Sequence, residues 1–233
     1  MYDVVVTEKD VFNDFEKNGI SAVILQPLPG APNAKQVHKR IYELSKEYPD
    51  KIFGLVSINP HVDDEIYLNE VDTLIKDYHF VGLKLHTVGH AINPLGKDAK
   101  KVFDAARKYK VPVMVHTGVG LPFASPALVL PRASEYPDVK IVLAHAGYGF
   151  VVSPEAFAVA KVTPNVYLET SWDDIYSKWW FINEIGADKV MFGSDLPINT
   201  TTELHQYRSL GLPEETLEKC LYNTAKQVFN LPI

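Results

Sequence analysis

The chain has 233 residues, of which 46% are hydrophobic and 22% charged, and its formal net charge is -6. This composition is ordinary for a soluble globular protein and excludes a disordered, collagen-like or disulfide-scaffold chain. The only cysteine, Cys220, excludes internal disulfides and a CxxC metal site. There is neither a basic stripe nor an apolar run of ~18–20 residues, so we expect no nucleic-acid partner, no membrane partner and a cytoplasmic location. The length suits a single domain over residues 1–233.

The first predicted helix covers Glu8–Asn18, with Thr7 as its N-cap and Asp10 completing a capping-box-like pair. The segment before it, Asp3–Val6, could form a short strand. The alternative is that the usual first strand is absent and the sheet is open between its second and last strands. An open edge invites pairing with another chain, so it could join two copies into a homodimer.

Short apolar, β-branched runs then recur along the chain, and their starts lie 24 to 31 residues apart. They are Ala22–Gln26, Phe53–Ile58, Val81–His86, Val111–His116, Lys140–His145, Val166–Thr170 and Val190–Asp195. Such nearly continuous runs are typical of strands buried on both faces of a parallel sheet. Helix-like stretches also occur, at Lys35–Glu47, Leu68–Ile75, Ala99–Tyr109 and Pro213–Phe229. The chain therefore alternates strands with helices.

This alternation predicts an α/β fold, either a doubly wound sheet or a closed (β/α)8 barrel. No GxGxxG turn follows any run, which disfavours a dinucleotide-binding sheet. Polar residues end the runs, as they do in barrel enzymes, where the carboxyl ends of the strands form the active site. These residues are Gln26, Asn59, His86, His116, His145, Glu169 and Asp195. We predict a TIM-type (β/α)8 barrel, distorted because its first strand is missing or degenerate.

Several strand ends carry groups suited to catalysis. Lys84 and His86 alternate with leucines, so they share the inner face of their strand, and His116, His145 and Asp195 end three other runs. Imidazole and carboxylate groups suit Zn²⁺ or a similar ion. Such an ion makes hydroxide available from bound water at neutral pH, and a nearby carboxylate or histidine can move the proton. These residues are therefore expected to converge on one site.

Structural roles compete with these chemical ones. A strand-end histidine often only bonds a loop, an aspartate before Leu-Pro often caps a turn, and Lys84 could neutralise an acidic neighbour. His90 could reach a substrate from its loop, and Trp172 could line a pocket, whereas Trp179 and Trp180 are expected to pack helices. A structural or solvated role is favoured for the remaining histidines, which are His38, His61, His79 and His205.

Five runs carry a family resemblance: VGLKLHT, VPVMVHTG, IVLAHAG, VYLETS and VMFGSDLP. In this order and spacing they resemble the amidohydrolase superfamily, in particular its amidohydrolase 2 branch of aminocarboxymuconate-semialdehyde-decarboxylase-like enzymes. The resemblance spans about Val11 to Phe229 and includes the YNTA segment of the last helix. It implies a distorted (β/α)8 barrel with a divalent metal at its mouth, zinc in the first place and manganese as the alternative.

The resemblance also implies roles for single residues. His116 matches a metal ligand, His145 matches a histidine that is a metal ligand or a catalytic residue, and Asp195 matches the aspartate that touches the metal and handles the proton of its water. Lys84 falls on the strand that supplies a carbamylated lysine in some members, and here it is expected to be a catalytic or substrate-binding cation. Substrate contacts are expected from His86, Asn59, Glu169 and Trp172. The family's opening His-x-His pair has no match, because the first histidine is His38, so the metal could bind weakly or be absent.

The first functional hypothesis is a metal-dependent hydrolase of a small polar carboxylate or amide. Metal-bound water attacks a carbonyl, Asp195 takes the proton, and His145 stabilises the oxyanion or protonates the leaving group. The second is non-oxidative decarboxylation with the same ligands, which the motifs do not distinguish from hydrolysis. The third is a shortened, inactive barrel that binds a ligand or forms an oligomer. A phosphate-handling barrel is disfavoured, because no Gly-rich cradle follows the last strands.

Overall fold

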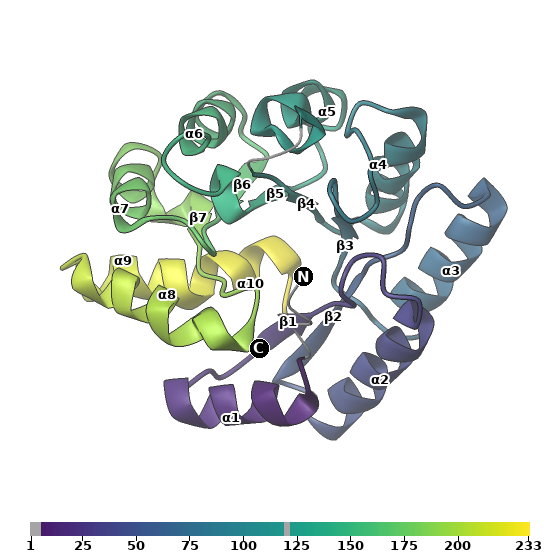
Figure 1. Ribbon diagram of the computed structural model, residues 1–233, viewed down its shortest axis with the longest axis horizontal. Coiled ribbons are helices and arrows are strands. Elements are labelled where there is room, and N and C mark those ends of the chain that lie inside the picture. The colour runs from purple at the N-terminus through teal and green to yellow at the C-terminus, as the bar shows by residue number, and fades with distance from the viewer. Residues whose placement is uncertain (1–5, 119–121) are drawn as a thin grey trace.

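The computed structural model describes residues 6–118 and 122–233. Seven parallel strands form one sheet in which they follow their order in the chain. They are β1 (Val23–Leu25), β2 (Ile52–Val56), β3 (Gly82–Leu85), β4 (Val113–His116), β5 (Ile141–Ala144), β6 (Val166–Glu169) and β7 (Val190–Met191). Figure 1 shows this sheet curling around a centre with the helices on its outside. The predicted barrel-like α/β fold is confirmed.

The helices alternate with the strands over most of the chain. They are α1 (Glu8–Asn18), α2 (Ala34–Glu47), α3 (Asp64–Lys76), α4 (Lys97–Tyr109), α5 (Leu130–Glu135), α6 (Ser153–Val162), α7 (Ile175–Glu184), α8 (Pro197–Ser209), α9 (Glu214–Glu218) and α10 (Thr224–Phe229). The predicted capping box of α1 is confirmed, because the amide of Thr7 donates to Asp10 Oδ2 at 2.8 Å and the amide of Asp10 donates to Thr7 Oγ1 at 3.3 Å.

The helix predicted over Pro213–Phe229 is interrupted by a π-helical segment, Lys219–Asn223, between α9 and α10. In this segment the carbonyl of Cys220 accepts a hydrogen bond from the amide of Phe192 at 2.8 Å. A π-helical turn loosens the regular backbone ladder, and here a helix carbonyl bonds the chain just after β7. The end of β7, which leads to Asp195, is thus attached to the last helical segment.

Side-chain alternation along the strands separates two apolar layers. Leu83, Leu85, Val113 and Val115 belong to the large cluster between the sheet and the surrounding helices. A second cluster lies on the opposite face of the strands and includes Leu55, Val142, Met191, Val228 and Phe229. Because neighbours in a strand point to opposite faces, Lys84 lies on the same inner face as this second cluster. The interior of the curled sheet is therefore apolar where the end of α10 covers it and polar at the carboxyl ends of the strands.

The two outer strands of the sheet are not paired with each other in the part of the chain that the structure describes, since β1 pairs with β2 and β7 pairs with β6. Helices bridge this opening on the outside, where Thr200 of α8 donates to Asp14 of α1 and Thr201 donates to Asn18 at 2.9 Å. Most of the strand expected over Asp3–Val6 falls on residues outside the described ones. Residues of α1, β1, β7 and α10 line a cavity of about 1070 Å³ that extends to the inner face of the sheet.

The buried face of α2 carries a histidine. His38 of α2, expected to have a structural role on a charged helix, is buried at 1% exposure and its Nε2 accepts the amide of Ser57 at 3.0 Å. It lies on the helix face that also buries Ile41 and Leu44, which explains why a position in a charged helix is buried.

Among the helices that the structure describes, none is long and apolar enough to cross a membrane.

Candidate active site at the carboxyl ends of the strands

Histidine rings from three neighbouring strand ends lie against one another. The rings of His86 and His116 stack with their centroids 4.2 Å apart, and the rings of His116 and His145 meet edge-on at 4.8 Å. The cavity of about 1070 Å³ is lined here by Lys84, His86, His145, Glu169 and Asp195. The structure thus brings together the strand-end groups that the sequence singled out.

All three imidazoles favour the neutral form. Burial is the main cause, and it lowers the pKa of His86 to about 3, of His116 to about 2 and of His145 to about 4. The positive charge of Lys84 lowers each of these pKa values further. Neutral imidazoles at pH 7 each keep one ring nitrogen with a free lone pair, so the site holds neutral acceptors rather than cationic histidines.

A hydrogen-bond relay determines which nitrogen of His145 carries its proton. The hydroxyl of Ser171 donates to Glu169 Oε2 at 3.0 Å, so its oxygen is left to accept from Nδ1 of His145, 2.8 Å away. The carboxylate of Glu169 also accepts the amides of Ser171 at 2.7 Å and of His145 at 3.2 Å. With the proton on Nδ1, the lone pair of His145 is on Nε2. Nε2 is therefore the atom of this ring that can take a proton from a substrate or a water.

Lys84 is a cation on the inner face of the sheet that lines the cavity, and it is buried at 4% exposure. Burial lowers the pKa of its ammonium group, while the charges of Asp195 and Glu169 oppose that change. A buried ammonium is most stable beside a negative charge. Asp195 and Glu169 supply negative charge here, and an anionic group of a bound molecule would add to it.

Three of the loops that follow the strands have unusual backbone geometry. His145, Trp172 and Asp195 directly follow or lie near the ends of β5, β6 and β7, and their φ angles are 66°, 64° and 62°. Residues other than glycine rarely adopt positive φ, and such positions persist only where surrounding contacts hold them. Here Trp172 Nε1 donates to Asp195 Oδ2 at 2.9 Å, which joins two of the strained positions.

A match to a family model shows which protein family the chain belongs to. The amidohydrolase model of the amidohydrolase 2 family matches residues 7–231. The chain belongs to the amidohydrolase family. The resemblance carried by the five strand-end motifs is thereby confirmed. No curated protein is significantly similar to this amidohydrolase in sequence.

Solved structures of the same fold include decarboxylases and a hydrolase. A dihydroxybenzoic acid decarboxylase from Polaromonas sp. JS666, with bound manganese and the inhibitor 2-nitroresorcinol, is 17% identical, with a TM-score of 0.77 over 99% of this chain and 87% of that one. The 2,6-dihydroxybenzoate decarboxylase from Rhizobium is 18% identical, with a TM-score of 0.75 over 97% and 89%. A probable 2-pyrone-4,6-dicarboxylic acid hydrolase from Acinetobacter baumannii, with citric acid bound, is 16% identical, with a TM-score of 0.75 over 99% and 91%.

The donors of this amidohydrolase do not make up a metal site by themselves. Among residues 6–118 and 122–233, no group of three or more histidine, cysteine or acidic side chains is arranged to hold a metal ion. Within the described residues His116 Nδ1 is buried without a hydrogen-bond partner, and Nε2 of His145 has a lone pair, so two imidazole donors are present. Catalytic zinc usually has three protein ligands. The expected ligands His116, His145 and Asp195 therefore do not form a complete metal site among the described residues.

Other candidates lie at the edge of the site or outside it. Asn59, expected to contact substrate, is exposed and its Oδ1 accepts the amide of His61 at 3.0 Å, so it stabilises the turn after β2 instead. His90 is buried with its ring centroid 6.3 Å from that of His86. Trp180 stacks on Phe157 with centroids 4.0 Å apart, which confirms its helix-packing role.

Sequence reasoning missed the groups behind the mouth. Ser171 holds the relay to His145, and Asn199 and Glu203 of α8 contact the loops that carry Trp172 and Asp195. The only trace of them in the sequence is the polar pair that follows the strand in VYLETS. Glu203 lies in a helix among other polar residues, and no local pattern distinguishes it from a solvated side chain.

Proposed function

We propose that this cavity is the active site of an enzyme that hydrolyses a small substrate bearing a carboxylate. The proposal depends on one observation: a buried lysine, neutral histidines and two carboxylates line a single cavity at the carboxyl ends of the strands. In barrels of this class that end of the strands is where chemistry occurs. The hydrolase among the structural neighbours is named for a dicarboxylic acid and binds citric acid, which supports a carboxylate substrate.

Lys84 is the proposed anchor of the substrate carboxylate. Its ammonium group is buried on the inner face, and a carboxylate at that point would offset the burial that lowers its pKa. Apolar side chains such as Met114, Met191 and Phe192 line the same cavity. They would contact the hydrocarbon part of the substrate and exclude water from the ion pair, which strengthens the contact.

Asp195 and His145 are the proposed proton-transfer groups. Asp195 or Nε2 of His145 accepts the proton of the attacking water as its oxygen bonds to the substrate carbonyl. The protonated group then returns that proton to the leaving group as the scissile bond breaks. The relay through Ser171 to Glu169 stabilises an imidazolium that forms transiently on His145, because Glu169 is at the far end of the relay.

A divalent ion, manganese or zinc, is a separate part of the proposal. The decarboxylase from Polaromonas holds manganese. In this chain the donors of the described residues do not complete a metal site, so none of the steps above passes through an ion. His116 and His145 are the residues that would contribute imidazole donors if further ligands were supplied.

Decarboxylation is the second candidate, favoured by the dihydroxybenzoate decarboxylases among the structural neighbours. In this reaction Asp195, in its protonated form, gives a proton to the carbon that bears the carboxylate. The bond to the carboxylate then breaks, its electron pair returns to that carbon, and CO₂ leaves. The same cavity could hold the substrate, and only the bond that breaks differs.

A substrate panel distinguishes these proposals. The purified chain is incubated with small carboxylate esters, amides and lactones and with hydroxybenzoates, and products are followed by mass spectrometry and CO₂ release. Hydrolysis products that disappear in Asp195→Asn and Lys84→Met support the hydrolase, and CO₂ release supports the decarboxylase. Carboxylate binding that depends on Lys84, without turnover on any substrate, would instead identify a ligand-binding barrel and overturn both.

A further inference from the structure

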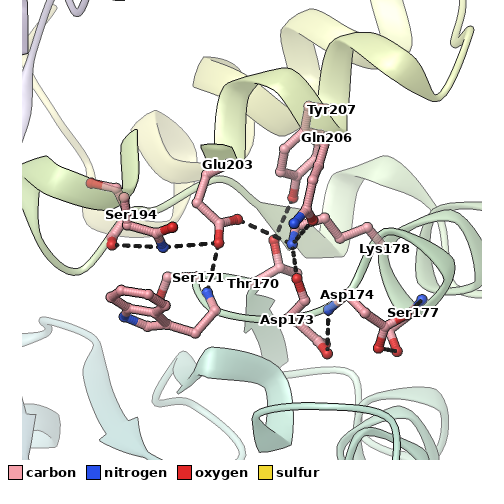
Figure 2. Close-up of polar contacts among 12 residues, drawn as sticks. Thr170, Ser171, Asp173, Asp174, Ser177, Lys178, Ser194, Glu203, Gln206 and Tyr207 are labelled. Carbon is pink, nitrogen blue, oxygen red and sulfur yellow. Dashed lines mark hydrogen bonds and ion pairs between the residues drawn. The ribbon is translucent and has the colours of Figure 1, made fainter. Parts of the chain in front are cut away.

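A buried ion pair lies behind the mouth of the cavity, between α7 and α8. Lys178 Nζ is 3.0 Å from Glu203 Oε2, and the two side chains are 0% and 2% exposed. Lys178 also donates to Gln206 Oε1 at 2.6 Å and to the carbonyl of Asp173, as Figure 2 shows. A buried pair of this kind costs desolvation energy that its attraction often does not exceed, so it contributes little net stability. What it holds in place is the better explanation for it.

The other carboxylate oxygen of Glu203 joins two loops. Oε1 accepts the backbone amide of Trp172 at 2.8 Å and the side-chain amide of Asn199 at 2.9 Å. Asn199 Nδ2 also donates to the carbonyl of Ser194 at 3.2 Å, directly before Asp195. Figure 2 shows Glu203 between Ser194 on one side and Lys178 on the other. One oxygen atom therefore links the loop after β6 to the loop after β7.

Both linked loops carry strained residues. Trp172 and Asp195 have φ angles of 64° and 62°, and their side chains are joined by the bond from the indole to the carboxylate. Neither backbone conformation is favourable alone, so it needs contacts that hold it. Glu203 provides the contact at Trp172 directly and the contact before Asp195 through Asn199.

We propose that Glu203, fixed by Lys178, is a positioning residue that sets the orientation of Asp195 and of the Trp172 indole beside it. This inference rests on the proposed function, because it concerns how the proton-transfer carboxylate is held. Glu203 does not touch the substrate. Its negative charge is needed only to match Lys178, whereas its oxygen Oε1 is needed to hold the two loops.

Two double variants separate charge from hydrogen bonding. Lys178→Met with Glu203→Gln removes both buried charges but keeps an oxygen that can accept the amides of Trp172 and Asn199. Lys178→Met with Glu203→Leu removes the charges and that oxygen. Neither leaves Lys178 or Glu203 as an unpaired buried charge, and replacing a buried ion pair by apolar groups is often tolerated. The two proteins thus differ in the amide group at position 203, whose oxygen is the acceptor for Trp172 and Asn199.

The readout is the indole N–H resonance of Trp172 in ¹H–¹⁵N spectra of the full chain, assigned with Trp172→Phe. Asp195→Ala gives the reference position of an indole without its carboxylate partner. We expect the resonance to stay near the wild-type position in the glutamine variant and to move to the reference position in the leucine variant. A folded leucine variant with the wild-type resonance, or a folded glutamine variant with the reference resonance, would overturn the proposal.

A third variant provides a test if the leucine protein does not fold. Asn199→Ala leaves the ion pair and the bond from Glu203 to Trp172 in place, and it breaks the bonds of Asn199 to Glu203 Oε1 and to the carbonyl of Ser194. We expect a partial shift of the Trp172 resonance toward the reference, and an unchanged resonance in a folded protein contradicts the link. Once a substrate is known, the leucine variant should lose about 10- to 100-fold in kcat with little change in KM. A chain without any turnover would refute the proposed function while the resonance test still stands.

Discussion

The indole nitrogen of Trp172 lies 2.9 Å from Oδ2 of Asp195, although the two residues are 23 positions apart and follow different strands. Both have positive φ, so each depends on its surroundings to keep its conformation. The contact restricts the carboxylate to one orientation at the edge of the cavity. The indole N–H also occupies one lone pair of Oδ2. Oδ1 is therefore the oxygen of Asp195 with more lone pairs left to accept a proton or a hydrogen bond.

Removal of this hydrogen bond should impair catalysis more than binding. Trp172→Phe keeps an aromatic ring but lacks the N–H donor. Since a hydrogen bond to a charged group is worth ~1.5–3 kcal/mol, we expect kcat to fall by about tenfold or more while KM changes little. Steady-state kinetics on the substrate found in the panel measure this. Trp179→Phe is the matched control, because Trp179 is exposed and its ring stacks on Tyr176; equal losses in both variants would contradict the role of Trp172.

Buried His38 should make the fold sensitive to acid. Burial lowers its pKa from 6.5 to about 4, so between these values the unfolded chain binds a proton that the folded chain does not. The free energy of unfolding therefore falls as pH decreases from about 6.5 to 4, by about 3 kcal/mol from this group. His38→Gln, which retains an acceptor for the Ser57 amide, should show that much less decrease in urea unfolding between pH 7 and pH 4. His205→Gln, on an exposed position, should follow the wild-type profile; a His38→Gln profile parallel to the wild type would refute the expectation.

Gly193 has a steric requirement at the site. A Cβ atom added there would lie 2.1 Å from Glu169 Oε1, and that oxygen is held by the amide of Ser171. Gly193→Ala should displace Glu169, weaken the relay to His145 and cost about 1–3 kcal/mol in thermal or urea unfolding, as overpacking does. Gly96→Ala is the control, since its nearest neighbour lies at 3.1 Å and its φ is negative. We expect a smaller cost of about 0.5–1 kcal/mol, because alanine is a poorer N-cap of α4 than glycine. The two variants would have to behave alike for this interpretation to fail.

The strands could be predicted from the sequence because the pattern of apolar and polar residues along each strand is local. In the run Val81–His86, Lys84 and His86 alternate with Leu83 and Leu85, and that alternation placed Lys84 and His86 correctly. It failed where contacts between distant elements decide. The link from Glu203 to the loop after β6 joins residues 31 positions apart, and no local pattern contains it.

The helices show the same difference between local patterns, which the sequence predicts, and long-range contacts, which it does not. The capping box of Thr7 and Asp10 is a local pattern, and it formed as predicted. The π-helical segment Lys219–Asn223 breaks a stretch whose periodicity predicts one continuous helix. Its cause is tertiary, because the carbonyl of Cys220 bonds the chain after β7. The sequence analysis did not predict the residues whose conformation depends on partners far along the chain.

Metal binding by this chain should be weak. His116 and His145 can each offer an imidazole nitrogen, but a third donor in reach is absent from the part of the chain that the structure describes. Structural zinc sites with a full ligand set bind with ~10–16 kcal/mol, whereas we expect dissociation constants of about 1 μM or weaker, equivalent to no more than about 8 kcal/mol. Titration calorimetry with Zn²⁺ and Mn²⁺ at pH 7 measures this, with His116→Ala expected to weaken binding further and His205→Ala, an exposed histidine, expected to leave it unchanged. Nanomolar binding that His116→Ala abolishes would instead show that the chain completes a metal site in solution with donors that are further apart in this structure.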